Sequence, residues 1–115
     1  MQEAKSVIEK LQLNPHPEGG WYRETWRAAG KDAERSPGTA ILYLLEAGCR
    51  SHWHRVDADE LWLWHAGAPL DLLIADADDA NSVTVTLGGD VCGGYTPHAL
   101  VPAPRRQAAE SQRGR

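Results

Sequence analysis

The sequence predicts an all-β domain, a sandwich or barrel of short strands preceded by one short helix. The clearest strand is the run 83–87, in which valine or leucine alternates with threonine at the two-residue period of a half-buried strand. Six further runs are candidates for short strands and are separated by turn residues. These runs are 21–26, 39–45, 51–54, 60–65, 70–74 and 99–101. Because no helical pattern alternates with them, a βαβ sheet is not expected.

The first residues predict one amphipathic helix over about 2–12. Val7, Ile8 and Leu11 fall at helical spacing, with charged side chains on the other faces. Pro15 begins a turn-rich stretch that cannot continue the helix, because proline lacks a backbone N–H and fixes φ.

The length of 115 residues indicates one domain, which we expect over residues 1–103 with a barrel over about 20–103. The segment 104–115 shows no strand pattern and is rich in arginine, so we expect a disordered basic tail there. This leaves open whether the last strands of the barrel are missing and whether the C-terminus is native.

Charge and hydropathy narrow the choice of partners. The formal net charge of −4 argues against a nucleic-acid or anionic-membrane partner. No apolar run approaches the ~20 residues of a membrane span, and the polar N-terminus lacks the pattern of a signal peptide. We therefore expect a cytoplasmic protein whose partner is a small molecule.

Two histidines and a glutamate form the candidate site. In an extended segment residues i and i+2 point to the same face, so His52 and His54 are expected to present their imidazoles side by side. The polar run 55–59 turns the chain, and the next strand returns Glu60 antiparallel to them. Two neutral imidazoles and one carboxylate can hold a divalent metal with positions left open. The alternative is a metal-free polar site in which the same three residues are the catalytic groups.

The same stretch resembles the first motif of the cupin superfamily. That motif consists of a glycine, an HxH pair, a glutamate and a second glycine. Gly48, His52, His54, Glu60 and Gly67 stand at these positions. The gap before the histidines is shorter than usual, and the gap between the histidines and the glutamate is longer.

More narrowly, three stretches resemble one small cupin family long labelled as a domain of unknown function. They are PEGGWYRET at 17–25, SHWHRVDADE at 51–60 and HAGAPL at 65–70. The resemblance implies a double-stranded β-helix, or jelly-roll barrel, and a homodimer. It assigns no established activity, and kinship with sugar-nucleotide epimerases and ligand-binding cupins is a likeness of fold.

The chain departs from the general cupin pattern near its end. Cupins generally supply a fourth ligand histidine from a second motif of the form PxGxxH, and the aligned stretch here is PAPRRQ at 102–107. Pro104 replaces the glycine, and Gln107 stands where the histidine would be, a substitution that the family also shows. Glutamine is a weak metal ligand, which argues against full metal occupancy. By its aligned position, the resemblance implies that Gln107 is a ligand-binding residue.

Aromatic and polar residues on neighbouring strands are expected to complete the ligand site. Trp62 and Trp64 share a strand face with Glu60 and could wall an apolar pocket, although core packing explains them equally well. The run 39–45 is apolar enough for a strand buried on both faces. The full set of ligand-binding candidates is Tyr22, Glu24, Tyr43, Trp62, Trp64 and Gln107.

These residues support three functional hypotheses. The first is a cupin that binds a small polar or sugar-like ligand, with metal-assisted proton transfer of the isomerase or epimerase type. The second is a non-haem metal-dependent oxygenase, which also uses two histidines and a carboxylate. The third is a non-catalytic ligand-binding module, so the sequence leaves open whether the protein is an enzyme.

Overall fold

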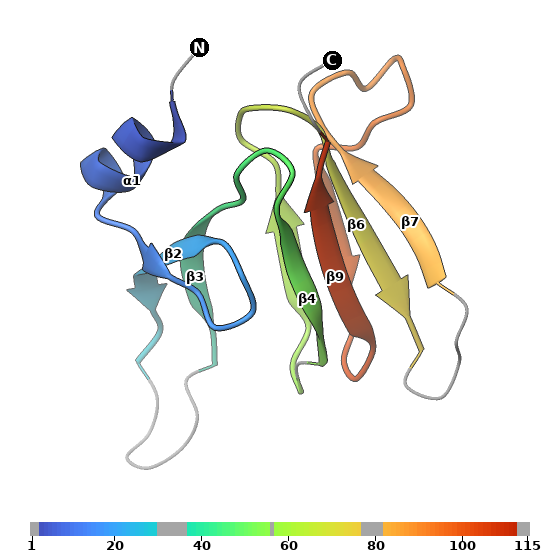
Figure 1. Ribbon diagram of the computed structural model, residues 1–115. Helices are drawn as coiled ribbons and strands as arrows, with labels where there is room; N and C mark the ends of the chain where they lie inside the picture. Colours follow the sequence, from blue (N-terminus) through green and yellow to red (C-terminus); the bar gives the residue numbers. More distant parts are fainter. Residues whose placement is uncertain (1–2, 30–36, 56, 77–81, 113–115) are drawn as a thin grey trace. The chain divides into compact units, whose positions relative to one another are not determined.

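The computed structural model describes residues 3–29, 37–55, 57–76 and 82–112. These residues form nine strands and one short helix (Figure 1), so the predicted all-β class with an N-terminal helix is confirmed. The chain divides into two compact units, Met1–Leu44 and Leu45–Arg115. Each unit is described by itself. The described helix is too short to cross a membrane.

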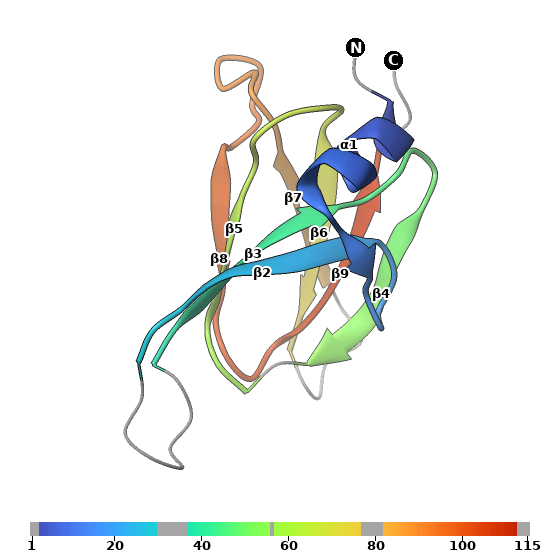
Figure 2. The same cartoon turned by 90° about the vertical axis from the view of Figure 1, so that its left-hand side faces the viewer.

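The first unit holds the helix and a three-stranded antiparallel sheet (Figure 2). Helix α1 (Ala4–Leu11) ends where Gln12 takes a left-handed conformation, with φ of 56°. The strands, in sheet order, are β1 (Asn14–Pro15), β2 (Trp21–Arg27) and β3 (Thr39–Leu44). Strand β1 was not predicted, because a two-residue strand carries no periodicity.

The turn between β1 and β2 explains the glycine pair in the sequence. Gly20 has φ of +82°, and a Cβ there would lie 2.5 Å from the hydroxyl oxygen of Tyr43. The Tyr43 hydroxyl donates a hydrogen bond to the carbonyl of Gly19. The backbone N–H of His16 donates to the carbonyl of Gly20 at 2.9 Å. The glycines therefore let the loop pass close to β3.

Strand β3 is less buried than its sequence predicts. Its first three residues are exposed, and Ile41 has 44% of its surface accessible. Within the sheet of the first unit β3 is an edge strand. The prediction of a strand buried on both faces is therefore wrong for the first half of the run.

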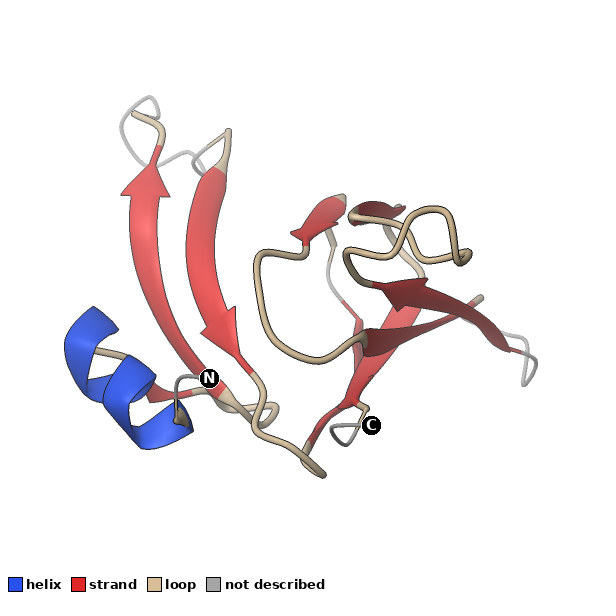
Figure 3. Cartoon of the chain, turned by 90° about the horizontal axis from the view of Figure 1, so that it is seen from above, coloured by secondary structure: helices blue, strands red, loops and turns tan. Residues whose placement is uncertain are grey.

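The second unit contains two antiparallel sheets (Figure 3). The larger, in sheet order, consists of β4 (Arg50–Arg55), β9 (Arg106–Ser111), β6 (Leu70–Ala75) and β7 (Ser82–Leu87). The smaller pairs β5 (Glu60–Leu63) with β8 (His98–Val101).

The core of the second unit lies between these two sheets. It is formed by Leu72, Ile74, Leu87, Val101 and Ala109, contributed by β6, β7, β8 and β9. Trp62 and Trp64 pack against this cluster. The leucines that alternate with them on β5 are more than half exposed. The alternation predicted for this strand is therefore confirmed, with the tryptophan face turned inward.

The predicted disordered tail over 104–115 is wrong for residues 106–111. These residues form β9, which lies between β4 and β6 at the centre of the larger sheet (Figure 1). Gln107, Ala108 and Ala109 are at most 1% exposed. The segment lacks a strand-like sequence because pairing on both edges, rather than side-chain propensity, specifies it. The folded region therefore extends beyond residue 103, and residues 113–115 lie outside the described part.

Candidate functional site

A β-bulge in β4 determines how its two histidines are presented. In the pairing of β4 with β9, Ser51 lies opposite Ala109 and His54 lies opposite Gln107, so β4 has one residue more than β9 over this interval. An extra residue breaks the i, i+2 alternation of a strand. Ser51 is buried and His54 is half-buried, while His52 is exposed. The expected side-by-side placement of the two imidazoles is therefore wrong.

Gln107 is the centre of the polar network that the structure shows. It lies on β9 and is 1% exposed. Its amide nitrogen donates to Oε2 of Glu60 at 2.9 Å and lies 3.1 Å from Nε2 of His54. Its amide oxygen accepts a hydrogen bond from the indole N–H of Trp62 at 2.9 Å. One buried side chain thus connects three residues from β4 and β5.

The register of the strands brings these residues together. Gln107 lies directly opposite His54 on β4 and opposite Ile74 on β6, so its backbone is held on both edges. Glu60 and Trp62 are on β5, two residues apart, and therefore share a strand face. That face packs toward the core, as the position of Trp62 shows.

A second hydrogen bond sets the orientation of the His54 ring. Its Nδ1 lies 2.8 Å from the backbone carbonyl of His52, which can only accept. Nδ1 therefore carries a proton in this arrangement. Nε2 is left to accept from the amide of Gln107, so every bond in the network has a donor and an acceptor.

The predicted site residues of the second unit thus differ in placement. His54, Glu60, Trp62 and Gln107 come together, whereas His52 is exposed and has no hydrogen bond to Gln107. Trp64 donates its indole N–H to the carbonyl of Ala68 at 3.3 Å, so its side chain stabilises the turn that follows β5. The structure gives Trp64 a packing role.

The predicted site residues of the first unit lie on β2 and β3. Tyr22 is directly opposite Tyr43 in the sheet register. The ring of His16 meets both tyrosine rings edge-on, with centroid distances of 4.8 Å to Tyr22 and 5.5 Å to Tyr43. His16 was not a predicted site residue. The sequence feature that could have indicated His16 is its position in the turn before the aromatic-rich run 21–26.

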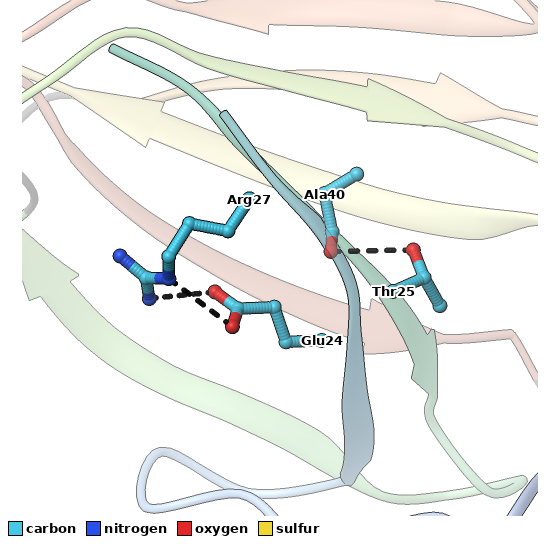
Figure 4. Close-up of polar contacts among 4 residues, drawn as sticks. All are labelled: Glu24, Thr25, Arg27 and Ala40. Atoms are coloured by element: carbon cyan, nitrogen blue, oxygen red, sulfur yellow. Dashed lines mark hydrogen bonds and ion pairs between the residues drawn. The ribbon is translucent and has the colours of Figure 1, made fainter. Parts of the chain in front are cut away.

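Glu24 takes part in a surface ion pair. Arg27 donates through Nη2 at 2.7 Å and through Nε at 3.3 Å to the two carboxylate oxygens of Glu24 (Figure 4). Both side chains are exposed. In the same view Thr25 donates its hydroxyl to the carbonyl of Ala40, across the sheet. The surroundings of Glu24 in its unit are those of an exposed strand surface.

The donor set does not fit the metal ion expected from the sequence. Within the described residues, no group of three or more His, Cys, Asp or Glu side chains is placed to hold a metal. The nitrogen of His54 that would bind a metal accepts from Gln107 instead, and so does one oxygen of Glu60. His52, the third expected ligand, lies within the bulged interval between Ser51 and His54 and is exposed.

Comparison with known proteins identifies the family. Residues 5–115 match the family described as Cupin superfamily (DUF985). The chain is similar to a protein from Shewanella oneidensis of known crystal structure, with 36% identity and a TM-score of 0.89. That match covers 96% of this chain and 70% of the other.

A hypothetical protein from Leishmania major is also similar, with 32% identity and a TM-score of 0.83. The match covers 95% of this chain and 70% of the other. The search of curated proteins gave no match. The family match over nearly the whole sequence confirms the cupin jelly-roll fold predicted from the motifs, and the chain belongs to the cupin superfamily, in the DUF985 family.

Proposed function

We propose that this cupin domain binds a small, hydroxyl-rich polar ligand, such as a sugar or sugar acid, at the carboxylate of Glu60. The observation that supports this proposal is the buried amide of Gln107, which fixes Glu60, His54 and Trp62 in one network. A buried polar network that is fully hydrogen-bonded holds its members in one geometry. Such a network is suited to presenting a binding group in a constant orientation.

The free atoms of the network define the ligand chemistry. Glu60 is half-buried, and its Oε2 is engaged by Gln107. Within the described part of the chain its Oε1 has no hydrogen-bond partner, so it can accept from a hydroxyl of a ligand. Trp62 adds an aromatic surface beside this carboxylate, and aromatic rings pack well against the apolar face of a sugar ring.

The same geometry supports proton transfer as the chemistry of the site. A general base needs one carboxylate oxygen held in place and the other directed at the substrate. Glu60 has this arrangement, with Oε2 held at 2.9 Å by Gln107. In this form of the proposal, Oε1 of Glu60 removes a proton from an acidic carbon of the ligand, as in an isomerase or epimerase.

Binding can be tested with the purified chain. Native mass spectrometry identifies any retained ligand, and calorimetric titration with monosaccharides, sugar acids and polyols measures affinity. We expect Glu60→Gln to weaken binding about 10- to 100-fold, because a hydrogen bond to a charged group contributes about 1.5–3 kcal/mol. The matched control is Glu110→Gln, since Glu110 lies on β9 in a surface ion pair with Arg50.

Two results would contradict the proposal. If Glu60→Gln and Glu110→Gln bind with equal affinity, the ligand binds elsewhere. If nothing is retained and no compound of the panel binds, there is no such site. Incubation of a bound ligand in D₂O then tests the chemistry, since incorporation of deuterium at carbon that is lost in Glu60→Gln supports proton transfer. A bound ligand without exchange identifies a non-catalytic binding module.

A further inference from the structure

We propose that Trp62 and Gln107 make this cupin site metal-independent. The two N–H groups of the Gln107 amide, oriented by the Trp62 indole, occupy the lone pair of His54 Nε2 and engage Oε2 of Glu60, so these two atoms are not available together to a metal ion. This inference concerns the same residues as the proposed ligand site. It goes beyond that proposal, because it holds whether or not a ligand binds at Glu60.

The indole of Trp62 fixes which way the amide points. An indole nitrogen donates and never accepts. Because Trp62 Nε1 lies 2.9 Å from Gln107, the atom facing it must be the amide oxygen. Turning the amide over would place its N–H groups against the indole N–H and its oxygen against the carboxylate of Glu60. Both contacts would be repulsive, so the amide nitrogen is directed toward His54 and Glu60.

The accepting atoms are the nitrogen through which His54 would bind a metal and one of the two carboxylate oxygens of Glu60. Metal ions bind an unprotonated imidazole nitrogen. In His54 that nitrogen is Nε2, because Nδ1 donates to the backbone carbonyl of His52. Nε2 lies 3.1 Å from the Gln107 amide nitrogen, and Oε2 of Glu60 lies 2.9 Å from the same atom. One NH₂ group therefore stands between both ligand atoms and donates one hydrogen to each.

The strand pairing prevents Gln107 from moving aside. Its backbone lies between β4 and β6, opposite His54 and Ile74, and its side chain is 1% exposed. A metal ion that binds Nε2 of His54 and Oε2 of Glu60 together must therefore break two hydrogen bonds without giving the amide new partners. Breaking these bonds reduces metal affinity about 100-fold relative to a site without the amide.

The test measures metal binding directly, with Ni²⁺ and Zn²⁺ as probes in calorimetric titration and metal analysis after dialysis. Gln107→Ala removes the amide and adds no ligand, so we expect it to bind about 100-fold more tightly than the original chain. Gln107→His also supplies an imidazole and should bind more tightly still. Gln112→Ala and Gln112→His are the matched controls, because Gln112 follows β9 and its side chain bonds to Asp71 rather than to the network around Gln107.

A second variant tests whether the metal bound by the Gln107 variants is held by the residues around position 107. Adding His54→Ala to Gln107→His should abolish this binding, whereas loss on removal of a surface histidine instead would overturn the assignment. Trp62→Phe keeps Gln107 but frees its amide to turn, so this variant should also bind Ni²⁺ and Zn²⁺ more tightly than the original chain. If circular dichroism shows that the Gln107 variants do not fold, Trp62→Phe provides the test.

Two outcomes overturn the proposal. One is tight, stoichiometric binding by the original chain that is lost in His54→Ala. The other is folded Gln107 or Trp62 variants that bind no better than the original chain. Neither outcome affects the ligand proposal, whose readout is the binding of sugar-like compounds in metal-free buffer.

Discussion

Replacing Gln107 by methionine tests whether the buried amide network stabilises the second unit. Methionine has nearly the same volume, so the substitution leaves little cavity. It removes the hydrogen bonds to Trp62, His54 and Glu60. Two of these are neutral and contribute about 1 kcal/mol each, and the bond to the Glu60 carboxylate contributes about 1.5–3 kcal/mol.

The sum of these contributions is an upper limit. His54 and Glu60 are half-buried, so water can replace the amide at both. Trp62 packs against the core cluster and is also half-buried, so water can replace the acceptor of its indole N–H in part. We therefore expect the free energy of unfolding to fall by about 2–3 kcal/mol. With an m-value of roughly 2 kcal/mol/M, the midpoint of urea unfolding falls by about 1–1.5 M.

The assay is urea unfolding followed by tryptophan fluorescence and by circular dichroism. Gln112→Met is the matched control, because Gln112 makes one side-chain hydrogen bond, to Asp71 at 3.0 Å, and is half-buried. It should lower the free energy of unfolding by less than about 1 kcal/mol. Equal midpoints for the two variants would show that the network contributes no more than one peripheral hydrogen bond, and the reasoning above would be wrong.

Four further substitutions test contacts within each unit by the same unfolding assay. Leu72→Ala should lower the free energy of unfolding by about 2–5 kcal/mol, since Leu72 is fully buried in the core cluster. Gly20→Ala should destabilise more than Gly67→Ala: both have positive φ, but only at Gly20 would a Cβ meet Tyr43. Glu24→Gln should change stability by less than about 1 kcal/mol, because its ion pair is exposed. A core-sized loss for Glu24→Gln, no loss for Leu72→Ala, or equal losses at the two glycines would contradict these assignments.

Local sequence patterns were enough to predict most strands. The alternation in 82–87 and the short runs that became β2 to β6 and β8 each carry their signal within a few residues. The turn around Gly19 and Gly20 was predicted as a turn-rich loop for the same reason, since proline and glycine restrict or release φ locally. Helix α1 also followed from spacing alone.

The candidate site was only partly predictable. The motif resemblance singled out His54, Glu60 and Gln107, and strand alternation added Trp62; all four meet in the structure. The pairing of His52 with His54 failed because a bulge depends on the register between β4 and β9. Register is a property of two strands, and one strand's sequence does not contain it.

The sequence by itself determined the fold class, the order of most strands and the identity of the residues that can do chemistry. Only the tertiary structure decided that 106–111 is a central strand and that Gln107 donates to both His54 and Glu60. The physical reason is the same in both cases. Backbone pairing on two edges makes a strand of a segment with weak propensity, and that pairing places a polar side chain where its hydrogen bonds set the chemistry of its neighbours.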